Sequence, residues 1–126
     1  MEIRKPRSRL TFMTVKRGDV LLVRLDPVQG SEQGKTRPCI VVQNDVGNTF
    51  SSTTIVAPIT SSLPDKDYPT TVVINQGEGG IEHTSTILCN QIRTISVPDR
   101  VIKKLGSVSP ALMKKVDEAL KCSLGL

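Results

Sequence analysis

Aromatic side chains are nearly absent from this chain of 126 residues, where they make up 2% of the sequence. Phe12, Phe50 and Tyr68 are the only ones, and tryptophan is missing altogether. Valine, isoleucine and leucine must therefore fill the core. The shortage also argues against a protein that binds single-stranded nucleic acid by stacking every base on an aromatic platform.

Groups that hold metals or phosphate-bearing cofactors are scarce as well. His83 is the only histidine, so one chain cannot supply two histidines for acid–base catalysis, and beside Glu82 in a predicted turn it is expected to be a surface residue. Carboxylates do not cluster within any predicted strand or helix, which argues against a magnesium-dependent nuclease. The glycines of residues 77–80 open no helix and predict a turn instead of a phosphate-binding loop. We expect neither a metal nor a cofactor.

The three cysteines, Cys39, Cys89 and Cys122, are odd in number and far apart. None belongs to a Cys-x-x-Cys pair, and with a single histidine they cannot complete a zinc site. Cys39 and Cys89 lie in apolar runs, where a small buried side chain is the common role. We expect a reducing compartment and a cytoplasmic protein. No membrane association is expected, because no apolar run could span a bilayer and the N-terminus lacks the apolar stretch of a secretory signal.

The net charge of +5 is unevenly distributed. Residues 1–12 contain four basic residues and one acidic residue, so they alone carry +3. We interpret them as a basic N-terminal extension, either disordered or ahead of the native start, and residues 13–126 as one domain. Since this domain carries only +2, its charge allows a nucleic-acid-binding surface but does not require one.

The remaining pattern is that of a mainly β protein. Apolar and β-branched runs bounded by glycine, proline, asparagine and aspartate predict strands over 20–25, 37–43, 53–60, 70–74 and a fifth, bent segment at 84–88 and 91–95. Residues 44–48 predict a turn, and residues 101–108 suit a short helix or a last strand. Short strands at this spacing predict a small antiparallel β-barrel or curled sheet.

One helix is predicted, at the C-terminus. Ser109 is a favourable N-cap, Pro110 suits the first helical position, and Gly125 suits the position after the last turn. One apolar face between them is expected to pack on the sheet, and it consists of Leu112, Met113, Val116, Ala119, Leu120 and Leu124.

Arg37 and Thr60 are the residues on which a candidate site can be built. If their two strands form a simple antiparallel hairpin, Gln43 pairs near Thr54, and Arg37 then lies opposite Thr60 at the open end of the sheet. The polar loop 27–36 runs into the same end. We therefore expect one cleft, to which the contributing side chains are Ser31, Glu32, Gln33, Lys35, Arg37 and Thr60.

An arginine facing a threonine suits a phosphodiester substrate. The planar guanidinium matches phosphate oxygens and stays charged, and a threonine hydroxyl can donate to a non-bridging oxygen. Both would stabilise the charge that grows in a pentacoordinate transition state. RNA brings its own nucleophile, the 2′-hydroxyl, so no metal-activated water is required. On pattern alone, an exposed arginine and an ordinary strand-forming threonine remain the more common explanation.

Six blocks of the sequence resemble the MazF/PemK (Kid) family of toxins. In order they are Lys16-Arg17-Gly18-Asp19-Val20, Gly30-Ser31-Glu32-Gln33-Gly34, Thr36-Arg37-Pro38 with its apolar strand and Gln43-Asn44-Asp45, Ile55-Val56-Ala57-Pro58-Ile59-Thr60, Gln91-Ile92-Arg93-Thr94-Ile95, and Met113-Lys114-Lys115-Val116-Asp117-Glu118-Ala119-Leu120. The resemblance covers residues 13–126 and leaves out the N-terminal extension.

This resemblance implies a small SH3-like, CcdB/PemK-type antiparallel barrel with a C-terminal helix. It implies a homodimeric mRNA interferase of a type II toxin–antitoxin system, that is, a sequence-specific, metal-independent endoribonuclease. Such proteins cleave single-stranded RNA by attack of the 2′-hydroxyl and leave 2′,3′-cyclic phosphate and 5′-hydroxyl ends. The implied partners are single-stranded mRNA and a MazE-like antitoxin, whose acidic, partly disordered tail would fold onto the cleft.

The family's motifs also imply roles for individual residues. The catalytic arginine falls on Arg37, the catalytic threonine on Thr60, the loop serine and glutamate on Ser31 and Glu32, and a strand glutamine on Gln91. Arg37 is expected to stabilise phosphate charge or to protonate the leaving 5′-oxygen, and the general base is expected to be Glu32 or a backbone group. RNA contacts are expected from Ser31, Gln33, Lys35, Asn44 and Gln91.

Two other functions stay open at this point. A CcdB-like toxin of the same architecture binds DNA gyrase and needs no nuclease site. A non-catalytic nucleic-acid-binding barrel would bind RNA with strong salt dependence and leave it intact. Asn90 stands where the family often has an acidic residue, which implies an altered sequence preference and not a loss of activity.

Overall fold

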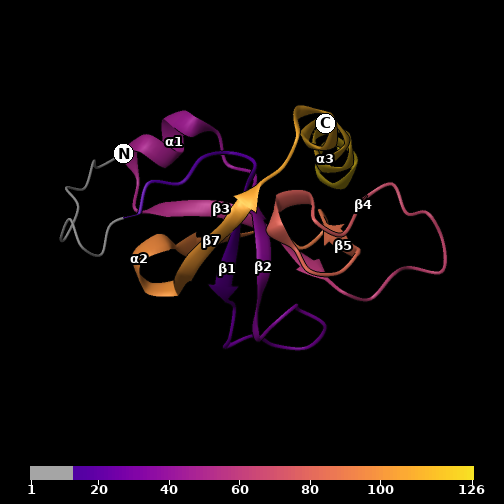
Figure 1. Cartoon of the computed structure of the whole chain (residues 1–126), viewed down its shortest axis with the longest axis horizontal. Coiled ribbons are helices and arrows are strands. Elements are labelled where there is room, and N and C mark those ends of the chain that lie inside the picture. The colour runs from indigo at the N-terminus through magenta and orange to yellow at the C-terminus, as the bar shows by residue number, and fades with distance from the viewer. Residues whose placement is uncertain (1–12) are drawn as a thin grey trace.

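The computed structural model describes residues 13–126, and the predicted N-terminal extension at 1–12 lies outside the described residues. Strands dominate, and one long helix ends the chain (Figure 1), so the prediction of a mainly β protein with a C-terminal helix is confirmed. The strands are β1 (Asp19–Arg24), β2 (Thr36–Val41), β3 (Thr53–Thr60), β4 (Thr71–Ile74), β5 (Ser85–Leu88), β6 (Arg93–Ser96) and β7 (Val101–Ser107). The helices are α1 (Asp45–Phe50), the 3-10 helix η1 (Glu78–Gly80), α2 (Val97–Arg100) and α3 (Pro110–Leu124).

One antiparallel sheet joins the strands in the order β4-β5-β3-β2-β1-β7, with β6 attached to β3. β3 is central because it pairs with three strands. Its first half pairs with β6, from Thr53 opposite Ser96 to Val56 opposite Arg93, and its last residues pair with β5. Pro58 falls between these two segments, and a proline supplies no N–H for a ladder. The partner on this side of β3 therefore changes around Pro58.

Two apolar cores lie on the two faces of the sheet. Along β2, Ile40 belongs to one core and its neighbours Cys39 and Val41 to the other, as the alternation of a strand requires. The core under α3 consists of Val20, Ile40, Val42, Ala57, Ile59, Val72, Ile74, Ile81, Ile87, Cys89, Leu112, Val116 and Ala119. The core on the other face consists of Val15, Leu21, Val23, Leu25, Cys39, Val41, Val56, Ile95 and Val97.

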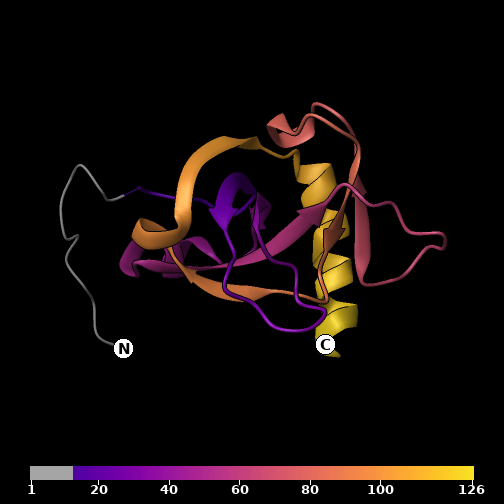
Figure 2. The ribbon, with the colours of Figure 1, turned by 90° about the horizontal axis from the view of Figure 1, so that it is seen from below.

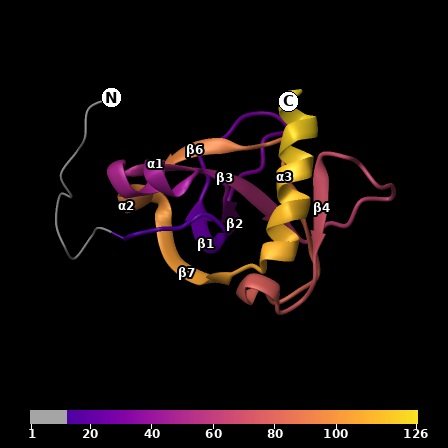
Figure 3. The ribbon, with the colours of Figure 1, turned by 90° about the horizontal axis from the view of Figure 1, so that it is seen from above.

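α3 lies beside β4 at one end of the molecule, and β7 curves from α2 toward the beginning of α3 (Figures 2 and 3). The predicted caps are confirmed: the Ser109 side chain accepts a hydrogen bond from the Leu112 N–H at 3.2 Å, and Gly125 ends the helix at a positive φ of 73°. The prediction that Leu124 packs on the sheet is wrong, because this side chain is 54% exposed past the edge of the core. Within the described part of the chain, no helix is long and apolar enough to cross a membrane.

Three further predictions concern single elements. The predicted turn at 44–48 is wrong, because Asp45–Phe50 form α1, whose N-cap Asn44 accepts a hydrogen bond from the Gly47 N–H at 2.8 Å. The predicted single bent strand is two strands, β5 and β6, because each pairs with a different part of β3. The segment left open as helix or strand is the strand β7.

The two ends of the sheet approach each other without pairing. β4 and β7 end the strand order, so a closed barrel is not confirmed. Instead, η1 packs on β7: a Cβ on Gly106 would lie 2.7 Å from the carbonyl carbon of Gly79, and a Cβ on Gly80 would collide with the Leu105 carbonyl. Backbone lies directly on backbone at this contact, which we call the glycine seam (Gly79, Gly80 and Gly106).

Candidate functional site

β2 and β3 pair in the register that the sequence predicted. Cys39 lies opposite Pro58, and the same register continued by two residues sets Arg37 opposite Thr60. The ladder between β2 and β3 stops at the pair of Cys39 and Pro58. Pro58 and Pro38, the next residue of β2, both lack the N–H group that a ladder needs. Arg37 and Thr60 therefore occupy the end of the sheet at which the two strands are no longer joined by hydrogen bonds.

One nitrogen of the Arg37 guanidinium is hydrogen-bonded within the protein, and the other two are available to bind a ligand. Nε donates to the Gly34 carbonyl at 2.8 Å, and the side chain is half-buried. The two terminal nitrogens have no hydrogen-bond partner among residues 13–126. A planar fork fixed at its base and open at its tip is suited to bind the oxygens of a phosphate.

The pKa of the buried thiol of Cys39 reflects both its burial and the charges near this end of the sheet. Burial raises the pKa of Cys39 to about 12, even though the positive charges of Arg37 and Arg93 act to lower it. The thiol therefore stays neutral at physiological pH and is not a nucleophile. The positive charges of Arg37 and Arg93 therefore both lie near enough to influence the Cys39 thiol.

Two arginines fix the base of the loop that precedes β2. Arg93 donates to the Leu25 carbonyl at 2.9 Å, and Arg100 donates to the carbonyls of Arg24 at 3.0 Å and Asp26 at 2.9 Å. The Leu25 N–H in turn donates to the Lys35 carbonyl at 2.8 Å, which closes the loop at its neck. These contacts come from β6 and α2, so the loop is anchored to elements far away in the sequence.

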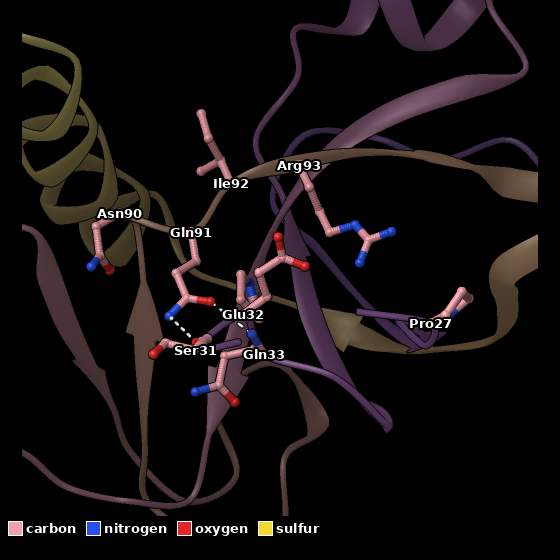
Figure 4. Close-up of a pocket in the computed structure, with 9 residues that line it drawn as sticks. Pro27, Ser31, Glu32, Gln33, Asn90, Gln91, Ile92 and Arg93 are labelled. Carbon is pink, nitrogen blue, oxygen red and sulfur yellow. Dashed lines mark hydrogen bonds between the residues drawn. The ribbon is translucent and has the colours of Figure 1, made fainter. Parts of the chain in front are cut away.

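The loop forms one wall of a hollow of about 570 Å³, which we call the loop cavity (Figure 4). Gln91 lies at its centre: its side-chain oxygen accepts a hydrogen bond from the Gln33 N–H at 2.8 Å, and its nitrogen donates to the Ser31 carbonyl at 3.4 Å. One oxygen of Glu32 accepts from the Gln29 N–H at 2.9 Å, and the other has no hydrogen-bond partner among the described residues. The lining residues are Pro27, Ser31, Glu32, Gln33, Pro58, Asn90, Gln91, Ile92 and Arg93.

Thr60 lines a second hollow of about 410 Å³, the threonine cavity. Its hydroxyl oxygen accepts a hydrogen bond from the Ser62 N–H at 3.3 Å, so its proton is left to donate to a ligand. The threonine cavity adjoins the loop cavity, because Gln33, Asn90 and Gln91 line both.

Arg37 lines a third hollow of about 470 Å³, the arginine cavity. Its floor is apolar, with Leu22, Ile59 and Leu105, and charged side chains including Lys103 stand at its rim. His83 lines it too and is exposed, as predicted for a surface residue, but next to Arg37. The expected single cleft is thus divided into three neighbouring hollows around the ends of β2 and β3.

Two predicted RNA-binding residues lie apart from the cavity linings. Lys35 is exposed at the neck of the loop and holds a left-handed backbone with φ 65°, a conformation that favours glycine. Asn44 caps α1, beyond the end of β2 that is opposite to Arg37. Its side-chain oxygen is used by the Gly47 N–H, so the structure does not bring Asn44 together with the other candidate residues.

Two residues that line the site, Arg93 and Thr86, were not singled out from the sequence, and Asn90 was expected only to alter the sequence preference. Arg93 lines the loop cavity, Asn90 lines both the loop and threonine cavities, and Thr86 lines the threonine cavity. Arg93 belongs to the block Gln91-Ile92-Arg93-Thr94-Ile95 and Asn90 directly precedes it, so their nearness to Gln91 in the sequence was a usable signal. Thr86 gave no signal, because an internal strand threonine is common. No group of three or more histidine, cysteine, aspartate or glutamate side chains suited to hold a metal occurs within residues 13–126.

Comparison with known proteins places the chain among toxins. The family described as PemK-like, MazF-like toxin of type II toxin-antitoxin system matches residues 16–124. A relative from Bacillus subtilis (strain 168), Endoribonuclease EndoA, is 50% identical over 114 residues, which are 90% of this chain and 97% of the relative.

Solved structures give the same result for the fold. An endoribonuclease in complex with its cognate antitoxin, from a mycobacterial species, matches with a TM-score of 0.73 and 25% identity over 89% of this chain and 96% of that chain. The crystal structure of MazF from Deinococcus radiodurans matches with a TM-score of 0.76 and 21% identity, over 91% of this chain and 100% of that chain. At the latter identity the likeness concerns the fold alone.

Proposed function

The chain belongs to the family of PemK-like, MazF-like toxins of type II toxin–antitoxin systems, and on this basis we propose that it is a sequence-specific endoribonuclease acting on single-stranded RNA. The observation that carries the proposal is the end of β2. There, the guanidinium of Arg37 keeps two unpartnered nitrogens, and the register of β2 and β3, continued past the ladder, sets Arg37 opposite Thr60. Arg37 lines the arginine cavity and Thr60 the threonine cavity, and two such hollows suit the two nucleotides that flank one phosphate of a chain substrate.

Cleavage proceeds by attack of the substrate's own 2′-hydroxyl. The 2′-oxygen bonds to phosphorus, the bond from phosphorus to the 5′-oxygen breaks, and the products are a 2′,3′-cyclic phosphate and a 5′-hydroxyl. Arg37 and Thr60 donate to the non-bridging oxygens, where charge grows in the transition state. The nucleophile is supplied by RNA, so no metal-activated water enters this reaction.

Two proton transfers complete the balance. The proton leaving the 2′-hydroxyl goes to Glu32 or to a backbone group, and the free oxygen of Glu32 in the loop cavity supports the first choice. The leaving 5′-oxygen takes a proton, and Arg37 is the proposed donor. Ser31, Gln33 and Gln91 contact the RNA along the loop cavity, and Lys35 contributes positive charge at its neck.

The partners follow from the family. We propose a MazE-like antitoxin whose acidic tail lies over the three cavities, since a related endoribonuclease has been solved with its cognate antitoxin. We also propose a homodimer, a cytoplasmic location in keeping with three free cysteines, and a single catalytic domain over 13–126, in keeping with the family match to 16–124. The finer fold assignment, an SH3-like, CcdB/PemK-type barrel, is supported by the glycine seam, which brings the sheet ends together.

Primer extension on a long RNA tests the function. Wild type is expected to cut at a short recurring sequence in excess chelator, and Arg37→Ala is expected to lose roughly 10²- to 10³-fold in rate while keeping its fold by circular dichroism. Lys114→Gln, on the exposed face of α3, is the control and is expected to cut like wild type. Intact RNA beside inhibited gyrase supercoiling would support a CcdB-like toxin instead, and a strict magnesium requirement would refute the metal-free chemistry.

A further inference from the structure

The hydroxyl of Thr86 is buried and has no hydrogen-bond partner. Thr86 is 1% exposed, and its Oγ1 is the single buried side-chain nitrogen or oxygen without a partner in the described part of the chain. A buried polar group left unpaired destabilises a fold, and such groups are rare in proteins and ask for an explanation. A valine of the same shape would remove the cost altogether.

Thr86 is the cross-strand neighbour of Thr60. β3 and β5 pair with Thr60 directly opposite Thr86, so both side chains leave the sheet on the same face. Both line the threonine cavity of about 410 Å³, together with Gln91. Side chains directly opposite each other in antiparallel strands have their Cβ atoms roughly 5 Å apart, close enough for two hydroxyls to reach one atom of a ligand.

Thr54, in the same strand as Thr60, shows how a buried threonine is ordinarily bonded. It is fully buried, and its hydroxyl donates to the side-chain oxygen of Asn48 at 2.7 Å. The hydroxyl of Thr54 therefore has a hydrogen-bond partner within the protein, and the hydroxyl of Thr86 has none. The difference between Thr54 and Thr86 is that only Thr86 lies at a cavity shared with Thr60.

We propose that Thr86 is a substrate-binding residue, whose hydroxyl donates to a phosphate oxygen of the RNA that Thr60 also contacts. The missing partner is then supplied by the substrate, and the unpaired hydroxyl is a stability cost tolerated for binding. A hydroxyl aligned before the reaction needs no reorganisation when charge grows on the phosphate, so its effect falls mainly on the transition state. This assignment rests on the proposed ribonuclease function.

Replacing each of the two buried threonines by valine, which has the same shape, tests the proposal, because the two variants are expected to differ in rate and in melting temperature. Thr86→Val is expected to lower kcat for cleavage of a short RNA by roughly 5- to 50-fold, to change KM by less than about threefold, and to leave the melting temperature equal or higher. Thr86→Ser, which keeps the hydroxyl, is expected to restore most of the rate. The control Thr54→Val is expected to lower the melting temperature and to keep kcat within about twofold of wild type below that temperature.

The outcomes separate this proposal from the function on which it rests. If wild type cleaves and Thr86→Val cleaves equally fast, or melts at a lower temperature than wild type, the role of Thr86 is overturned while the ribonuclease stands. If wild type leaves RNA intact, the function itself fails, and the role of Thr86 fails with it. A rate loss in Thr86→Val with an unchanged or raised melting temperature supports both.

Discussion

Gln91 accepts a hydrogen bond from the backbone N–H of Gln33 at 2.8 Å, across 58 positions of sequence. The same amide donates to the Ser31 carbonyl, so one side chain joins the turn after β5 to the loop before β2. Because an amide both accepts and donates, no other uncharged side chain of this length replaces it. The wall of the loop cavity therefore depends on a residue that also faces the proposed substrate.

The first prediction concerns this contact. Gln91→Ala is expected to lower kcat/KM for RNA cleavage by about tenfold, since the loop loses its fixed position and the RNA loses a polar contact. The melting temperature should fall only slightly, because one part-buried bond to Gln33 and one long, exposed bond to Ser31 are lost. Gln76→Ala, an exposed glutamine before η1, serves as control. Equal kcat/KM in Gln91→Ala and wild type would show that the loop holds its shape without this side chain.

The second prediction uses the left-handed backbone of Lys35. Lys35→Gly is expected to raise the free energy of unfolding by about 1 kcal/mol, because glycine adopts φ 65° without the clash of a Cβ. Lys35→Ala removes the same charge but keeps the clash, so it is expected to give no gain. Urea unfolding of both variants makes the comparison. A gain in Lys35→Ala of the same size would assign the effect to charge and not to backbone strain.

A third prediction contrasts two ion pairs. Arg17 donates to the Val42 carbonyl at 2.9 Å and pairs with Asp117 at 2.5 Å, which ties the start of β1 to the end of β2 and to α3. Since these side chains are 30% and 42% exposed, solvent weakens the ion pair, and most of the loss in Arg17→Ala should come from the carbonyl bond. We expect a loss of roughly 1–2 kcal/mol in urea unfolding for Arg17→Ala.

Lys121 provides the matched control for Arg17. Its pair with Glu118 spans 3.4 Å with both side chains more than half exposed, so Lys121→Ala is expected to cost less than about 0.5 kcal/mol. Comparable losses in Arg17→Ala and Lys121→Ala would mean that Arg17 contributes only as a surface charge.

The fourth prediction follows from the thiols. Burial raises the pKa of both Cys39 and Cys89 to about 12, against 9.0 in an unfolded chain. Both groups therefore favour the folded state fully below pH 9, and this contribution is lost as pH rises from 9 toward 12, where the unfolded chain ionises first. Urea unfolding should show lower stability at pH 10.5 than at pH 8, and the Cys89→Ala variant should show a smaller drop over that interval.

Alkylation gives an independent check of the same thiols. At pH 8 in the folded protein, iodoacetamide is expected to modify Cys122, which is exposed, and to spare Cys39 and Cys89. Mass spectrometry of the peptides reads this directly. Modification of Cys39 at the rate of Cys122 would mean that the end of β2 opens in solution.

The pairing of β2 with β3 was predicted by assuming a simple antiparallel hairpin, in which the register could have slipped. Both faces of β2 are buried in apolar cores, so its apolar run does not by itself select the register that sets Arg37 opposite Thr60. The caps of α3 were predictable from the residues themselves, because Ser109 and Gly125 act through their own backbone and side chain. Local chemistry thus sufficed where neighbours in sequence are also neighbours in space.

α1 was not predictable, because its stability comes from outside the segment. Its six residues include Gly47 and Asn48, both poor helix formers. Asn48 is nevertheless buried, donates to the Gln43 carbonyl at 3.1 Å and accepts from the Thr54 hydroxyl at 2.7 Å. The bond from Thr54 requires β3 to be in place, and residues 44–50 by themselves contain neither of these two partners of Asn48.

The cavities were beyond the sequence for a related reason. The position of the loop before β2 depends on the side chains that bind its base. These are Arg93 and Arg100, which lie late in the chain. The residues of one predicted cleft are consequently shared among three hollows. The unpaired hydroxyl of Thr86 is a property of the folded structure, because it depends on which groups surround the side chain once the strands have packed.

The glycine seam sets a limit on how this protein can vary. Gly80 and Gly106 lie where any added carbon would meet backbone, so a substitution at either position must push η1 away from β7 or bend the strand. β7 carries the connection from α2 to α3, and η1 leads into the strand that pairs with Thr60. In a saturation screen for loss of toxicity, these two positions should rank with the proposed catalytic residues, although neither carries a functional group.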